Sequence, residues 1–93
     1  IVYGTDLGNA GPKPGIDRRE VKAMAAAGLS ATDIVRSATV DAARRLGLAD
    51  RGSLRPGAVA DIVGVSGRPG TDPSALTRLG LVMRHGRLVR GPA

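Results

Sequence analysis

The stretch from residue 46 to residue 65, LGLADRGSLRPGAVADIVGV, constrains the fold of this chain more than any other part. Leu46-Gly47 predicts the end of a helix with glycine at the left-handed stop, and Arg55-Pro56-Gly57 predicts a tight turn. A short apolar strand is expected from Ala60 to Val65, entered through Asp61. Few folds need these signals in this order. Because the stretch contains no histidine, cysteine or serine–base pair, it indicates a fold without containing an active site.

The residues before this stretch predict a strand and three helices. Residues 1–5 are apolar and β-branched, which favours a short strand, and Asp6 and a glycine- and proline-rich loop end it. Helices are expected over residues 17–28, 30–38 and 39–47. Each of the three begins with an aspartate, a serine or a threonine, residue types that cap helix N-termini with their side-chain oxygens.

The residues after the stretch predict antiparallel strands. Residues 79–84 and 87–90 have strand character and are joined at His85-Gly86, which suits a two-residue hairpin turn. Asp72-Pro73 can begin one turn of helix in the loop that precedes them. We interpret Asp61 as structural, with its carboxylate accepting hydrogen bonds from backbone amides of the turns between residues 52 and 57.

The chain is poorly supplied with large apolar side chains. It has 93 residues, 42% of them hydrophobic, and Tyr3 is its single aromatic residue. A domain of this size buries only roughly 60–65% of its unfolded surface, and the small side chains contribute little area each. Residues 1–47 have the pattern of a closing α/β unit and residues 58–91 that of antiparallel strands. We therefore expect each half to need a partner that this sequence does not contain.

The net charge of +6 raises the question of nucleic acid binding. Twelve of the basic residues are arginines, spread along the whole chain in runs no longer than two, without aromatics between them to stack on bases. This distribution favours a solvated surface over a nucleic-acid interface. The sequence contains no cysteine, which excludes disulfides and thiolate metal sites and fits a cytoplasmic protein. Neither a signal peptide nor a membrane span is expected.

Asp6 is the strongest candidate for a catalytic residue. It directly follows an apolar strand that ends in Gly-Thr, and in parallel α/β folds ligands bind outside the carboxyl ends of the strands. The alternative is an aspartate that caps a loop or faces solvent. A catalytic zinc site needs about three protein ligands, and the sequence offers no second ligand nearby. The single histidine, His85, is explained by the hairpin turn without a metal.

Several of these motifs together resemble the carboxyl-terminal end of the amidohydrolase superfamily, in its imidazolonepropionase and dipeptidase-like branch. The likeness covers about residues 1–91 and is most specific over residues 46–65. It also rests on GTD at residues 4–6, Ala38-Thr39 with Ala42-Ala43, a loop with Gly70 to Pro73, and the hairpin LVMRHGRLV.

The resemblance implies an α/β fold that is incomplete as a stand-alone unit. Residues 1–50 would be the end of a metal-dependent (β/α)8 barrel, with its eighth strand, rim loop and closing helices. Residues 51–93 would be part of a small β-sandwich assembled from both chain ends. The His-x-His of the first barrel strand and the middle-strand histidines are absent, so the missing amino-terminal barrel portion would come from the same polypeptide or from a second chain. A homo-oligomer is also compatible with this interpretation.

The resemblance also implies the chemistry of a metal-dependent hydrolase that acts on small-molecule amides. The cofactor would be one or two divalent metal ions, with zinc preferred. Asp6 would match the family's aspartate after the eighth strand, which binds metal and takes the proton of the activated water. Asn9 and Lys13 would lie at the substrate rim. We expect the 93 residues alone to be inactive.

Two interpretations from other classes compete with this one. Residues 25–47 also suit a helix-turn-helix, with Arg44 and Arg45 directed toward DNA. The turn between these helices has no glycine, however, and Asp41 would face phosphates at the start of the reading helix. The third interpretation is a non-enzymatic interaction module that uses unpaired strand edges.

Overall fold

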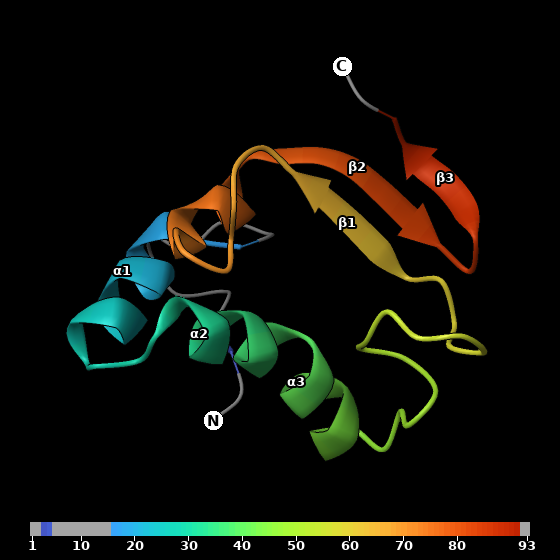
Figure 1. Cartoon of the computed structure of the whole chain (residues 1–93), viewed down its shortest axis with the longest axis horizontal. Helices are drawn as coiled ribbons and strands as arrows, with labels where there is room; N and C mark the ends of the chain where they lie inside the picture. The colour runs from blue at the N-terminus through green and yellow to red at the C-terminus, as the bar shows by residue number, and fades with distance from the viewer. Residues whose placement is uncertain (1–2, 5–15, 92–93) are drawn as a thin grey trace.

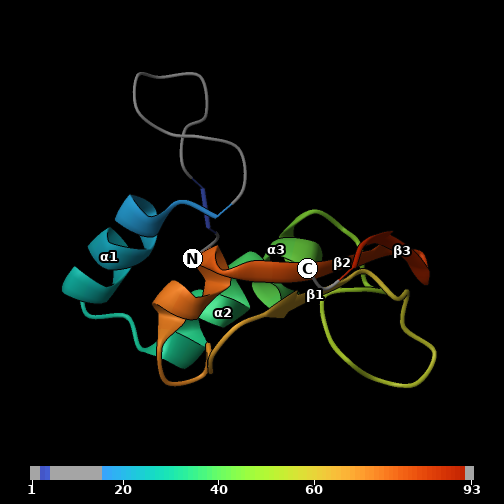
Figure 2. The same ribbon diagram turned by 90° about the horizontal axis from the view of Figure 1, so that it is seen from above.

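The computed structural model describes residues 3–4 and 16–91. Three helices come first, α1 (Arg18–Ala26), α2 (Ala31–Ala38) and α3 (Val40–Arg45). Strand β1 (Ile62–Val65), the 3-10 helix η1 (Pro73–Thr77) and strands β2 (Leu79–Arg84) and β3 (Arg87–Arg90) follow. The helices lie on one side of the molecule and the sheet on the other, connected by a long irregular segment (Figure 1). Viewed from above, α1 lies at one end and β3 at the other (Figure 2).

The first two helices begin where their capping residues predict. The Asp17 carboxylate accepts the amide of Arg19 at 2.7 Å at the start of α1. At the start of α2, the Ser30 hydroxyl accepts the amide of Asp33 at 3.1 Å and the Asp33 carboxylate accepts the amide of Ser30 at 3.0 Å. These two bonds form a complete capping box. The predicted N-caps of both helices are therefore confirmed.

The predicted cap of the third helix is wrong. Thr39 precedes α3, but its side chain makes no cap hydrogen bond there. Its hydroxyl instead donates to the carbonyl of Val35 at 2.8 Å. Because α2 and α3 are separated by this single residue, the hydroxyl lies within reach of the unpaired carbonyls at the end of α2, and it satisfies one of them.

The predicted helix end and tight turn of the segment 46–65 are both present. Gly47 follows α3 with φ +75°, and the amide of Leu48 donates to the carbonyl of Ala43 at 2.8 Å. In the turn, the amide of Ala58 donates to the carbonyl of Arg55 at 3.1 Å, and Gly57 has φ +86°. Proline followed by a glycine with positive φ is typical of a type II turn. The strand is shorter than predicted, since it begins at Ile62 rather than at residue 60.

The sheet is antiparallel, with the strand order β1-β2-β3. Val63 lies opposite Val82 in the first pairing, and Arg84 lies opposite Arg87 in the second. The predicted hairpin turn is confirmed, because His85 and Gly86 have φ values of +49° and +75°. Of the strand predicted over residues 1–5, only Tyr3 and Gly4 are described, and neither belongs to a strand.

The core lies between the helices and η1. The buried hydrophobic residues of the described part are Val21, Met24, Ile34, Ala43 and Ala75. The 3-10 helix η1 packs against both α1 and α2, so a segment that follows β1 in the sequence completes the core of the helical region. Asp72 caps η1 by accepting the amide of Ser74 at 3.1 Å, as its position before proline predicts. No helix in the described ranges is long and apolar enough to cross a membrane.

Candidate functional site

The three residues with a predicted role in catalysis or substrate contact lie outside the described residues. Asp6, Asn9 and Lys13 all fall between residues 5 and 15, so their roles stay predictions. The structure does describe both flanks of this segment, Tyr3-Gly4 on one side and Ile16-Asp17 on the other.

Tyr3 connects these two flanks to each other and to the helices. Its backbone amide donates to the carbonyl of Ser37 at 3.0 Å, near the end of α2. Its phenol oxygen accepts the backbone amide of Asp17 at 2.8 Å, immediately before α1. Partial burial raises the pKa of the Tyr3 phenol, and the Asp17 amide acts in the opposite direction because it stabilises the phenolate. The sequence alone assigns Tyr3 no role, although it is the single aromatic residue and lies three positions before Asp6.

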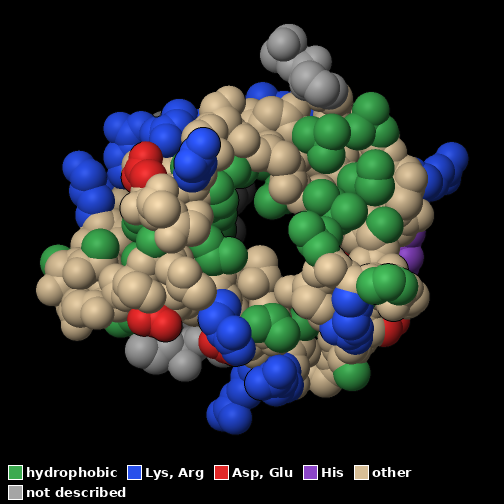
Figure 3. Space-filling view, in the orientation of Figure 1, with side chains coloured by type: hydrophobic (Ala, Val, Ile, Leu, Met, Phe, Trp, Pro, Cys, Tyr) green, Lys and Arg blue, Asp and Glu red, His purple; other side chains and the backbone are tan. Residues whose placement is uncertain are grey.

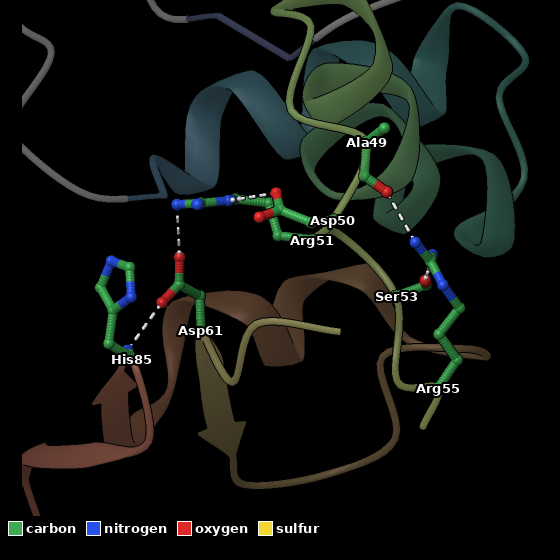
Figure 4. Close-up of polar contacts among 7 residues, drawn as sticks. All are labelled: Ala49, Asp50, Arg51, Ser53, Arg55, Asp61 and His85. Carbon is green, nitrogen blue, oxygen red and sulfur yellow. Dashed lines mark hydrogen bonds and ion pairs between the residues drawn. The ribbon is translucent and has the colours of Figure 1, made fainter. Parts of the chain in front are cut away.

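Asp61 is structural, as predicted, but the predicted partners are wrong. Its carboxylate accepts the backbone amide of His85 at 2.9 Å and the Nη1 of Arg51 at 3.2 Å, instead of amides between residues 52 and 57 (Figure 4). The hydrogen bond from His85 is the largest of several contacts that lower the pKa of Asp61. Because β1 pairs with β2, the start of β1 lies beside the hairpin turn, which brings its exposed amide within reach of Asp61.

Arg51 extends this contact to the segment after α3. Its Nε donates to the Asp50 carboxylate at 3.1 Å while its Nη1 reaches Asp61, so one guanidinium bridges two carboxylates (Figure 4). The hydrogen bond from Arg51 lowers the pKa of Asp50. We call these four residues, Asp50, Arg51, Asp61 and His85, the Asp61 joint. One local signal points to it: Asp50-Arg51 lies between a helix end and a tight turn, where charged side chains have backbone and carboxylate partners nearby.

The Asp61 joint has the features of a structural connection. His85 takes part through its backbone amide, and its backbone has a positive φ. The Asp61 carboxylate already accepts two hydrogen bonds, one from this amide and one from Arg51. Among residues 3–4 and 16–91, no three His, Cys, Asp or Glu side chains are grouped so that they could hold a metal ion. The joint therefore fixes the hairpin to the segment after α3.

The segment between α3 and β1 is further held by Arg55. Its Nη2 donates to the carbonyl of Ala49 at 2.6 Å, and its Nη1 donates to the hydroxyl of Ser53 (Figure 4). Arg55 thus holds together the part of this segment that precedes the tight turn at Pro56-Gly57.

The basic side chains do not form one continuous patch on the face shown in Figure 3, where Lys and Arg lie in several separate groups. Several arginines are engaged with carboxylates, including Arg51, Arg78 with Asp72 at 3.0 Å, and Arg36 with Asp41 at 4.0 Å. Hydrophobic side chains gather over the sheet and around an opening between the sheet and the helices (Figure 3). The strand residues Val63, Leu88 and Val89 are 56%, 58% and 67% exposed.

The sequence and the structure of this chain are both similar to those of known proteins. A protein-family model, described as the amidohydrolase family, matches residues 1–89 of this chain. An imidazolonepropionase from Deinococcus deserti is 42% identical over 65 residues, which are 68% of this chain and 16% of that protein.

Two solved structures are also similar. A crystal structure of an amidohydrolase has a TM-score of 0.69 and 34% identity, over 77% of this chain and 18% of that chain. A crystal structure of an Xaa-Pro dipeptidase with methionine bound in its active site has a TM-score of 0.73 and 34% identity, over 78% of this chain and 18% of that chain. The chain thus spans less than a fifth of the length of the relatives it matches.

Proposed function

Because this chain belongs to the amidohydrolase family, we propose that it is the carboxyl-terminal part of a metal-dependent hydrolase that cleaves amide or other C–N bonds. The observation that carries this proposal is the family match, which extends over residues 1–89 and includes the segment around Asp6. The similarity to an imidazolonepropionase and to an Xaa-Pro dipeptidase supports hydrolysis of a C–N bond as the reaction class. The proposed substrate is a small-molecule amide.

In the proposed enzyme, Asp6 is the residue of this chain that binds metal and shuttles a proton. A carboxylate is a suitable ligand for zinc, and a bound divalent ion makes water acidic enough to attack an amide near neutral pH. We propose one or two divalent ions, with zinc preferred. The described residues contain no group of three His, Cys, Asp or Glu side chains that could hold a metal ion, and we propose that the remaining ligands come from the preceding part of the polypeptide. Asn9 and Lys13 are proposed to line the substrate rim.

The proposed architecture is the end of a (β/α)8 barrel, residues 1–50, followed by part of a small β-sandwich, residues 51–93. Hydrophobic residues of the strands are exposed, and an opening lies between the sheet and the helices (Figure 3). Both features support the proposal that another segment packs there. Uncovered apolar surface of this kind is typical of an interface. We propose the cytoplasm as the compartment, with which a sequence that contains no cysteine is compatible.

Expression of the complete polypeptide with zinc tests the proposal. Imidazolonepropionate and the dipeptide methionylproline are the first substrates to assay, because they represent the two named relatives. We expect Asp6→Asn to lower turnover about 10²- to 10⁴-fold, the usual contribution of a general acid–base group. Asp41→Asn is the matched control, because the described contact of Asp41 is an ion pair at 4.0 Å on the surface of α3. Equal activity of the Asp6→Asn variant and the wild type would refute the assigned role.

The 93 residues alone are proposed to be inactive, because the other metal ligands and most of the barrel are elsewhere. Purified, zinc-loaded chain should show no hydrolysis of either substrate above the buffer rate. Addition of the separately expressed preceding part should restore hydrolysis if the two parts associate. Turnover by the isolated chain would contradict this proposal.

A further inference from the structure

The loop between β1 and β2, residues 66–78, reaches from the sheet to the helices. It begins at Ser66, directly after β1, and ends at Arg78, directly before β2. Between these ends it contains η1, which contacts α1 and α2 as well as β1 and is the orange helix beside α1 in Figure 1. Ala75, within η1, is 0% exposed and belongs to the core of the helical region. We call residues 66–78 the β1–β2 loop.

Arg78 closes the base of the β1–β2 loop. The amide of Ser66 donates to the carbonyl of Arg78 at 2.9 Å, and the Nε of Arg78 donates to the carbonyl of Ser66 at 3.1 Å. The Nη2 of the same guanidinium donates to the Asp72 carboxylate at 3.0 Å. Because Asp72 also caps η1, one side chain joins the end of β1 to the start of the 3-10 helix.

Gly67 gives this guanidinium the space it occupies. A Cβ at Gly67 would lie 3.1 Å from the Nη2 of Arg78 and 3.2 Å from the Cβ of Ala75. Gly67 also has φ +108°, a backbone conformation that glycine adopts without a steric penalty. The clamping side chain and the buried residue of η1 are therefore both close to the backbone that leaves β1, and the loop is packed against itself.

We propose that the β1–β2 loop is a rigid connection that couples the Ser66 end of the sheet to helices α1 and α2, with Arg78 as the side chain that keeps the loop closed. The Asp61 joint attaches the other end of β1 to the segment after α3. Attachments at both ends of one strand oppose rotation of the sheet about either of them. The sheet and the closing helices are then held in one relative orientation. This coupling does not depend on the proposed chemistry of Asp6.

Amide hydrogen exchange in the complete polypeptide tests the closure of the loop. In Arg78→Met we expect exchange at the Ser66 amide to become about 5- to 10-fold faster, because an ion pair and a hydrogen bond to a carbonyl are lost. Arg68→Met is the matched control. Arg68 is exposed in the same loop, and its side chain makes no hydrogen bond or ion pair with other residues that the structure describes. Equal exchange at Ser66 in Arg78→Met and the wild type would overturn the proposal.

A double-mutant cycle tests whether the closed loop transmits changes from the helices to the sheet. Ile34→Val removes one methyl group from a fully buried side chain of α2. We expect it to accelerate exchange at Ser66 about 3-fold when Arg78 is present, and to have little effect there in Arg78→Met. Coupled sites show such non-additive effects. If the two effects on Ser66 were additive, Arg78 would stiffen the loop alone, and the proposed coupling would be refuted.

Asp72→Asn approaches the ion pair from its other end. The side-chain oxygen of asparagine can still cap η1, whereas the negative charge that pairs with Arg78 is lost. We expect exchange at Ser66 to become about 2- to 3-fold faster, a smaller effect than in Arg78→Met, because Arg78 keeps its hydrogen bond to the Ser66 carbonyl. This variant decides the question if Arg78→Met does not fold. Unchanged exchange at Ser66 in folded Asp72→Asn would then overturn the proposal.

Discussion

Where α1, α2 and η1 meet, side chains such as Val21, Ile34 and Ala75 are almost completely removed from solvent. None of the residues in β1, β2 and β3 is buried to this degree, and β3 is exposed along its whole length. The helical region is held by its own packing, whereas the sheet is held by backbone pairing and by the Asp61 joint. The uncovered hydrophobic residues of the sheet support the proposal that another part of the protein packs there.

The largest expected effect comes from the centre of the helical region. Ile34→Ala should lower the free energy of unfolding by about 2–5 kcal/mol, because it removes a fully buried side chain and leaves a cavity. Val63→Ala, in a residue that is 56% exposed on the sheet, should change it by only about 0.5 kcal/mol. Urea denaturation followed by circular dichroism measures both. The comparison between helices and sheet fails if the two variants are equally destabilised.

The second prediction concerns the point where the connecting segment touches the helical region. A Cβ at Gly52 would lie 2.8 Å from the Cβ of Ala43 and 3.0 Å from the carbonyl oxygen of Thr39, and Gly52 also has φ +94°. We expect Gly52→Ala to cost about 1–3 kcal/mol from overpacking, in addition to the backbone strain. Gly57 has a similar φ of +86° with no atom within 4 Å, so Gly57→Ala should cost only about 1–2 kcal/mol, from the backbone alone.

Thermal unfolding of the two glycine variants measures the difference. If Gly57→Ala were as destabilising as Gly52→Ala, close packing of the segment on α3 would make no measurable contribution to the free energy of unfolding.

The third prediction concerns the Asp61 joint on the sheet side. Asp61→Ala removes the acceptor of the His85 amide and one partner of Arg51. Amide exchange should become faster at His85, whereas the core helix amide of Ile34, bonded to Ser30 at 3.0 Å, should keep its protection. A local effect of this kind is expected when a contact stabilises one region more than the whole molecule. Faster exchange at both amides would show that the sheet and the helices unfold as one unit.

Contacts between residues close together in the sequence are predicted correctly more often than contacts between distant residues. The N-cap at Ser30, the turn at Pro56-Gly57 and the hairpin at His85-Gly86 depend on residues within four positions, and the sequence predicts all three. Asp61 was assigned the wrong partner because the correct one is 24 positions away and becomes a neighbour only when β1 pairs with β2. Thr39 shows a local failure, since its hydroxyl had two backbone partners to choose from and bonds the preceding helix.

The candidate site shows the same limit in another form. Asp6 was identified from the strand signal before it and from a family resemblance, and its role, like those of Asn9 and Lys13, stays a prediction. The family itself is confirmed by the match over residues 1–89. Tyr3 was not assigned a role from the sequence, because its function as an acceptor depends on where α1 begins relative to residue 3 in space.

The smallest expected effect is a dependence of the Asp61 joint on pH, which sharpens the contrast between joint and core. The pKa of Asp61 is lowered in the folded protein, chiefly by the hydrogen bond from the His85 amide and further by the positive charges of the His85, Arg51 and Arg84 side chains. A carboxyl whose pKa is lower in the folded state binds protons more readily when unfolded. Its contribution to stability is therefore present above the unfolded value of about 3.9 and is lost as the pH falls through the lowered folded value.

Exchange at the His85 amide, corrected for the intrinsic pH dependence of exchange, should accelerate over this acid range in the wild type. In Asp61→Asn, whose amide oxygen can still accept the His85 hydrogen bond but does not titrate, this acceleration should be absent, and an acceleration equal to that of the wild type would show that another acid group controls the hairpin.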